Sequence, residues 1–152
     1  MAGFNVLGFN HTSFTVTELD RTIAFFRDLL GFELQSRGPR DDTVIQRLTR
    51  IPGASISVAF LSGPGHTVEL IEYTGPDGRG RFLPPMCDAG ASHIALDVDE
   101  LDAAIEGSRG YGFEPMGEVV TINDGPNQGR RIVYLRSLDG LTVEFLEVRA
   151  AG

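Results

Sequence analysis

Two histidines and two glutamates occupy matching places in two similar stretches of the sequence. His11 and His93 are separated by 82 residues, and Glu69 and Glu144 by 75 residues. Imidazole nitrogens and carboxylate oxygens bind divalent transition metals, and carboxylates also remove protons from carbon. A single strand histidine is usually structural, but two His and two Glu gathered together repel one another or stay protonated unless a cation binds them. The pattern therefore predicts a metal site with acid–base chemistry.

The four side chains belong to an internal repeat. The stretch "HTSFTVTELDRTI" from residue 11 aligns with "HIALDVDELDAAI" from residue 93, and "GHTVELIEY" at 65–73 aligns with "GLTVEFLEV" at 140–148. A Gly-Phe-Glu triplet follows in each copy, at 31–33 and 112–114. Two copies of one supersecondary unit explain this order better than chance does.

Each copy predicts a strand, a helix and then further strands. In the first copy, alternation over 9–16 predicts a strand, a helix follows from 17 or 18 until Gly31, and 56–62 and 67–73 form a hairpin. In the second copy the corresponding ranges are 93–98, 99–110, 131–137 and 141–148. One more strand is expected around 33–47 and around 114–122, and the Gly- and Pro-rich stretch 74–92 connects the copies.

Alternation along the predicted strands assigns each side chain to a face. Val68 and Leu70 fall on the apolar face, which suits packing against a helix, whereas Glu69 falls on the opposite face. The same rule puts His11, His93 and Glu144 on the less apolar face. Three other polar residues are expected to be exposed to solvent: Glu72, Glu147 and His66.

Length and composition limit the classes of protein. With 152 residues, 41% of them hydrophobic, the chain is expected to form one domain with one core. The net charge of −8 argues against a nucleic-acid partner. No apolar run approaches the length of a membrane span and no signal peptide is recognisable, so a cytoplasmic protein is expected. The one cysteine, Cys87, cannot form an intrachain disulfide.

The duplicated unit with His11, Glu69, His93 and Glu144 resembles the vicinal oxygen chelate superfamily, which includes glyoxalase I, methylmalonyl-CoA epimerase, extradiol dioxygenases and bleomycin-resistance proteins. The resemblance implies an α+β fold of two tandem βαβββ modules that form a cupped, incomplete β-barrel. We therefore expect a single domain over 1–152, with module 1 at about 8–74, a linker at about 75–90 and module 2 at about 91–148. It also implies a homodimer, and the four ligands come from one chain or from two.

The same resemblance implies a divalent metal ion (Zn, Ni, Co, Mn or Fe) held by these four side chains. The expected reaction is that of a lyase, isomerase or epimerase, which abstracts a proton alpha to a metal-chelated oxygen of a small oxygenated substrate. Glu144 is the first candidate for the base and Glu69 the second. The stretch "VELIEYTGPDG" is similar to methylmalonyl-CoA epimerase, while Thr15 and Tyr73 replace residues that bind glutathione in bacterial glyoxalase I.

Two other functions stay open from the sequence. One is a non-enzymatic protein that binds a small molecule such as an antibiotic and confers resistance. The other, weaker alternative is an iron-dependent ring-cleaving dioxygenase. The sequence names neither the substrate nor the metal, and leaves open whether CoA or glutathione takes part.

Overall fold

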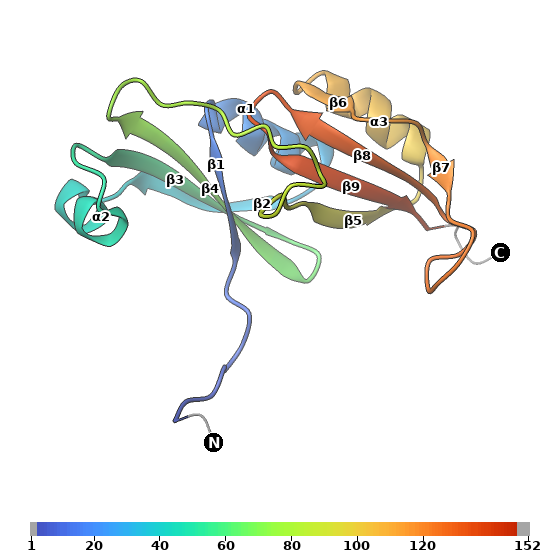
Figure 1. Ribbon diagram of the computed structural model, residues 1–152, viewed down its shortest axis with the longest axis horizontal. Helices are drawn as coiled ribbons and strands as arrows, with labels where there is room; N and C mark the ends of the chain where they lie inside the picture. Colours follow the sequence, from blue (N-terminus) through green and yellow to red (C-terminus); the bar gives the residue numbers. More distant parts are fainter. Residues whose placement is uncertain (1–2, 149–152) are drawn as a thin grey trace. The chain divides into compact units, whose positions relative to one another are not determined.

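The computed structural model describes residues 3–148, and it divides into two compact units, 1–76 and 77–152 (Figure 1). The boundary between the units falls in the Gly- and Pro-rich connecting stretch. Unit 1 contains β1 (Thr12–Val16), α1 (Leu19–Ala24), the π-helical turn η1 (Phe25–Leu29), β2 (Glu33–Pro39), α2 (Asp42–Thr49), β3 (Ser55–Gly63) and β4 (His66–Gly75). Unit 2 contains β5 (Ile94–Val98), α3 (Leu101–Arg109), β6 (Phe113–Pro115), β7 (Val120–Thr121), β8 (Arg131–Ser137) and β9 (Thr142–Glu147).

Both sheets have the same topology. The strand order is β1-β4-β3-β2 in unit 1 and β5-β9-β8-β6 in unit 2, with β7 also paired to β8. In each unit the first strand runs parallel to the last, so that Ser13 pairs with Glu69 and Ala95 pairs with Glu144. These two pairs are equivalent in the repeat. The predicted α+β fold of two duplicated modules is therefore confirmed, and neither sheet closes into a barrel.

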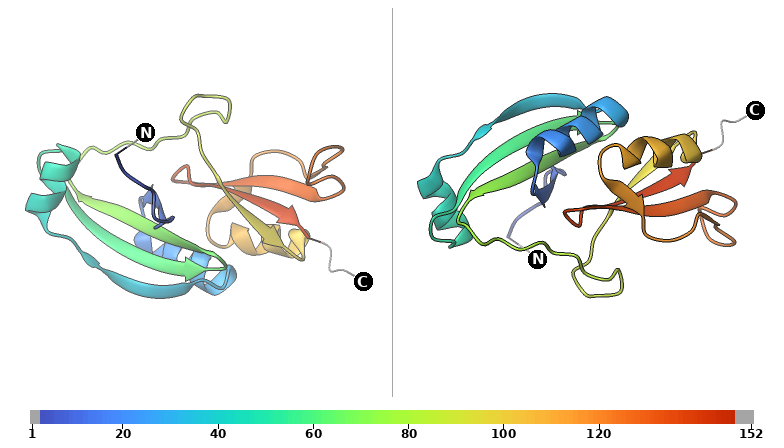
Figure 2. Two further views of the ribbon diagram at one scale, coloured as in Figure 1. Left: turned by 90° about the horizontal axis from the view of Figure 1, so that it is seen from below. Right: turned by 90° about the horizontal axis from the view of Figure 1, so that it is seen from above.

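A helix covers one face of each sheet, as Figure 2 shows for α1 and α3. In unit 1, α1 packs on β3 and β4, and Leu19 and Ile23 are buried beneath it. The wider π turn that follows places two consecutive residues, Phe25 and Phe26, in the core with no exposed surface. In unit 2, α3 packs on β6, β8 and β9. The opposite face of each sheet carries Glu69 in unit 1 and Glu144 in unit 2, with apolar side chains beside them.

The strand predicted around 33–47 is shorter than expected. The second part of this prediction is wrong, because residues 42–49 form the helix α2 and do not continue the strand. Asp41 caps this helix by accepting a hydrogen bond from the N–H of Val44 at 2.9 Å, and Arg50 ends it in the left-handed conformation with φ of 58°. Ile45 of α2 packs against the core residues Ala54, Ile56 and Val58 of unit 1, so α2 belongs to the body of this unit.

The strand predicted around 114–122 is also broken, into β6 and β7. Pro115 ends β6, and Gly117 follows between the two short strands. Proline has no N–H to donate to a sheet and glycine weakens a strand, which explains the interruption. Over residues 3–148, no helix has the length and apolar character needed to cross a membrane.

Candidate metal centre

His11 and Glu69 meet in unit 1. His11 directly precedes β1, and Glu69 lies in β4, the parallel neighbour of β1. The distance from His11 Nε2 to Glu69 Oε2 is 3.3 Å, and the two side chains are 32% and 15% exposed. Because the last strand, β4, lies beside the first strand, β1, two residues that are far apart in the sequence come together.

The same arrangement recurs in unit 2. His93 directly precedes β5, and Glu144 lies in its parallel neighbour β9. His93 Nε2 is 2.8 Å from Glu144 Oε2, and the side chains are 34% and 11% exposed. The two His–Glu pairs thus agree in strand position, in the atoms that face each other and in degree of burial.

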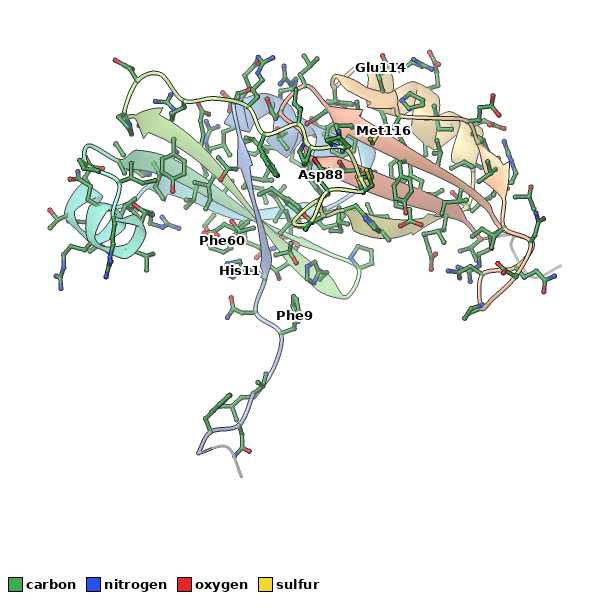
Figure 3. The ribbon with its side chains drawn as sticks, viewed as in Figure 1. Phe9, His11, Phe60, Asp88, Glu114 and Met116 are labelled. Atoms are coloured by element: carbon green, nitrogen blue, oxygen red, sulfur yellow. The ribbon has the colours of Figure 1, made fainter. Side chains whose placement is uncertain are left out.

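An aromatic ring from the strand before the last one in each unit lies beside the imidazole. Phe60 of β3 pairs with Glu69, and its ring lies edge-on to that of His11 with 5.5 Å between the ring centroids. Figure 3 labels both residues. Tyr134 of β8 pairs with Glu144, and its ring lies 5.1 Å from that of His93 at 70°. Sequence reasoning did not assign these two residues. The signal was present, because "ISVAFLS" and "RIVYLRS" each carry one aromatic residue directly before a leucine.

The electrostatic surroundings of the two pairs differ. In unit 2, burial raises the pKa of the Tyr134 hydroxyl, and the nearby Glu144 carboxylate raises it further. In unit 1 the equivalent residue is Phe60, which has no hydroxyl, and the guanidinium of Arg40 lies 5.9 Å from the centroid of its ring. One pair therefore has a phenol beside it and the other has a cation over an aromatic ring.

Asn10 orients the imidazole of His11. The Nδ1 atom of His11 lies 2.6 Å from Oδ1 of Asn10, and because that oxygen only accepts, the imidazole donates from Nδ1. Metal-binding histidines usually donate their second ring N–H to such an acceptor, which directs the other nitrogen toward the metal. Here the other nitrogen, Nε2, is the atom that faces Glu69.

The donor atoms suit a divalent transition metal. Two ligand atoms that each lie about 2.1 Å from a cation, at a right angle, are about 3 Å apart. The separations of 3.3 Å and 2.8 Å in the two pairs match this spacing. Each pair offers one imidazole nitrogen and one carboxylate oxygen, and within residues 3–148 no group of three or more His, Cys, Asp and Glu side chains is gathered at ligand distance. Each unit thus contributes half of the predicted ligand set.

Glu72 and Glu147, expected in solvent, instead hold the starts of the helices. Glu72 Oε2 accepts a hydrogen bond from the N–H of Leu19 at 2.9 Å, and Glu147 Oε1 accepts one from the N–H of Leu101 at 3.3 Å. Arg131 also donates to Glu147 at 3.2 Å. The prediction failed because the acceptor for each helix start comes from the last strand, about fifty residues away in the chain, and a helix start is normally capped from its own sequence neighbours.

His66 is half-buried, and the prediction that it is exposed was wrong. Its Nε2 lies 2.8 Å from the hydroxyl of Thr12, and its ring is 5.3 Å from that of Phe9. The contact with Thr12 lies on the helix-facing side of β1, because Thr12 pairs with Val68. His66 therefore belongs to the packing behind the sheet and does not join the His11–Glu69 pair.

Comparison with known proteins finds one protein family over most of the chain. The sequence profile of the Glyoxalase/Bleomycin resistance protein/Dioxygenase superfamily matches residues 8–145. A 2-epi-5-epi-valiolone epimerase from Actinomyces sp is 36% identical over 146 residues, which cover 93% of this chain and 79% of that protein.

Solved structures show the same fold. A glyoxalase family protein from Bacillus cereus has a TM-score of 0.81 and 24% sequence identity, with 99% of both chains covered. A point mutant of the fosfomycin resistance protein FosX from Listeria monocytogenes, complexed with Mn(II) and 1S,2S-dihydroxypropylphosphonic acid, has a TM-score of 0.60 at 18% identity and covers 93% of this chain and 90% of that chain.

Proposed function

Since the chain belongs to the Glyoxalase/Bleomycin resistance protein/Dioxygenase superfamily, we propose that it is a divalent-metal-dependent epimerase that inverts a carbon next to a carbonyl in a small oxygenated substrate. The observation that carries this proposal is the pair of equivalent His–Glu contacts, at 3.3 Å and 2.8 Å, in the two units. The 36% identity to an epimerase favours this reaction over that of a lyase.

In this proposal His11, Glu69, His93 and Glu144 are the ligands of one divalent cation (Zn, Ni, Co, Mn or Fe). They come together within one chain or across a homodimer. A relative with the same fold is complexed with Mn(II), which supports a metal in this family. When bound, the cation would supply Lewis-acid chemistry toward neighbouring oxygens of the substrate.

Glu144 is the proposed base, and Glu69 is its counterpart. The side chain of Glu144 is the less exposed of the two, at 11% against 15%, and Glu144 pairs with Tyr134 on the neighbouring strand. Glu144 takes the proton from the carbon next to the carbonyl, and the electron pair of the broken C–H bond moves toward the carbonyl oxygen. Glu69, which starts the reaction as the protonated acid, gives its proton to the opposite face of that carbon; this yields the epimer and leaves Glu144 protonated and Glu69 as the carboxylate.

Elemental analysis and isotope exchange test the proposal together. The protein, purified without chelator, should contain near-stoichiometric metal, and His93→Ala should lose it. In D2O, wild type should incorporate deuterium into 2-epi-5-epi-valiolone, which serves as the probe substrate because the relative is named for it. Glu144→Gln should keep the fold but lose the exchange.

A matched control is Glu106→Gln, which removes a carboxylate that is 83% exposed on α3. This variant should leave the metal content and the deuterium exchange unchanged. Stoichiometric metal with no deuterium exchange would retain the ligand assignment and reject this substrate. Absence of metal in wild type, even after reloading, would overturn the proposal and favour a protein that binds a small molecule without transforming it.

A further inference from the structure

A hollow of about 250 Å³ lies within unit 2 and has walls from three segments. The connecting stretch contributes Met86, the stretch between β6 and β7 contributes Met116 and Glu118, and Val120 comes from β7. Strand β8 forms the floor with Ile132 and Tyr134. Figure 3 labels Met116 on this part of the chain.

Hydrogen bonds to β8 hold the two methionine walls in place. The N–H of Met116 donates to the carbonyl oxygen of Tyr134 at 2.8 Å. The guanidinium Nη2 of Arg136 lies 3.2 Å from the sulfur of Met86 and donates to it. The hollow is thus built on the strand that also carries the aromatic neighbour of Glu144.

The hollow and the His93–Glu144 pair share one side chain. Tyr134 lines the hollow, pairs with Glu144 across β8 and β9, and has its ring 5.1 Å from the ring of His93. The hollow and the His93–Glu144 pair are therefore close enough for one small molecule to contact both. This adjacency gives the hollow a place in the proposed reaction.

We propose that this hollow binds the hydrocarbon part of the substrate, a single carbocycle or a short alkyl group, while the oxygens of the same molecule face His93 and Glu144. The inference rests in part on the proposed function. Apolar side chains dominate the lining, and the side chains in it that carry polar groups are Glu118 and Tyr134. Methionine side chains are flexible and polarizable, so that two of them fit closely around a ring.

Size restricts the ligand further. Pockets that enclose a whole drug-sized ligand have volumes of about 300–1,000 Å³, so a hollow of about 250 Å³ holds one ring or a short chain. A CoA or glutathione group is too large to be enclosed there. The hydrocarbon frame of the substrate is therefore a single ring or a short chain.

Methyl NMR of the metal-free protein tests the hollow. The sequence contains three methionines, and two of them, Met86 and Met116, line the hollow, so methionine labelled with ¹³C at the methyl group gives a spectrum that reports mostly on this site. The probes are trans-cyclohexane-1,2-diol and ethane-1,2-diol, which share a vicinal diol but differ in the ring. The cyclic diol should shift both signals saturably, and the acyclic diol should leave them in place at the same concentrations.

Val120→Asp introduces a carboxylate into the lining and should weaken binding of the cyclic diol about tenfold or more. Val120 is 53% exposed, so the variant should fold. Val119→Asp is the matched control, because its neighbour Val119 is 37% exposed and does not line the hollow, and it should bind the diol as wild type does.

Equal shifts with both diols, no shift up to the solubility limit, or equal weakening by both aspartate variants would overturn the proposal. Because the measurement uses metal-free protein, it is independent of catalysis. Saturable binding of the cyclic diol in a protein that holds no metal after reloading would retain the hollow and reject the proposed function. Bound metal and deuterium exchange in a protein that does not bind the cyclic diol would retain the proposed function and reject the hollow as a binding site.

Discussion

Removal of the Glu72 carboxylate tests whether a strand residue caps α1. The N–H of Leu19 donates to Glu72 Oε2 at 2.9 Å, Leu19 is 1% exposed, and the residue that precedes the helix, Glu18, makes no side-chain cap of its own. A hydrogen bond to a charged acceptor contributes about 1.5–3 kcal/mol, and a buried donor left without an acceptor loses all of it. Glu72→Ala should therefore lower the free energy of unfolding by about 1.5–3 kcal/mol.

Glu72→Gln separates the hydrogen bond from the charge. The amide oxygen still accepts from Leu19, and only the attraction between a negative charge and the helix start is lost, about 0.3–1 kcal/mol. Urea unfolding gives the free energies, and amide hydrogen exchange at Leu19 gives the local effect. The exchange should accelerate about tenfold or more in Glu72→Ala, since 1.4 kcal/mol corresponds to a factor of ten.

Glu106→Ala, at an 83% exposed carboxylate, is the control and should change stability by less than about 0.5 kcal/mol. The reasoning fails if Glu72→Ala unfolds at the same urea concentration as the control while the Leu19 amide exchanges at the wild-type rate. In that case the 2.9 Å contact contributes nothing, and α1 is held by burial of its apolar side chains alone.

Three other variants follow from the structure. Asn10→Ala should raise the dissociation constant of the metal about tenfold or more in a chelator competition, because the acceptor for the imidazole is lost, whereas Asn10→Asp should keep tight binding. The hydrogen bond from Arg131 lowers the pKa of the Asp102 carboxyl from 3.8. Wild type should therefore have a higher free energy of unfolding than Asp102→Asn at neutral pH, and this difference, measured by urea unfolding, should vanish as the pH falls below 3.8. Gly140 has φ of 93° and faces the carbonyl of Phe82, so Gly140→Ala should unfold at lower urea, with a loss of about 1–3 kcal/mol; unchanged stability would show that the loop moves freely.

Local patterns in the sequence were sufficient for the repeat and for the faces of the strands. A strand alternates with a period of two, so the placement of Glu69 opposite Val68 follows from neighbouring residues alone, and the register confirms it. Three strands in each copy were predicted for the same reason, and the helix after each first strand was predicted from apolar residues spaced three or four apart. The joint role of the four side chains in binding one metal stays a prediction.

What the sequence did not reveal depends on contacts between distant segments or on competing local signals. Glu72 contacts Leu19 only because β4 returns beside β1, and no local rule pairs two residues so far apart. The helix α2 was missed because the stretch before it is a strand, and the cap by Asp41 was not recognised as a start signal. The tilt of Phe60 toward His11 likewise depends on the pairing of β3 with β4.

The three-residue spacing of Glu69 and Glu72 in β4, repeated as Glu144 and Glu147 in β9, has a consequence for folding. Since the spacing is odd, each last strand presents one carboxylate to either side of its sheet, and each carboxylate has a partner only on its own side. A slip of the strand by one residue would push one carboxylate under the helix without a partner and turn the apolar side chains toward solvent. Such a mispaired chain would be unstable from the moment it formed, so two similar modules in one chain each accept a single alignment of the last strand.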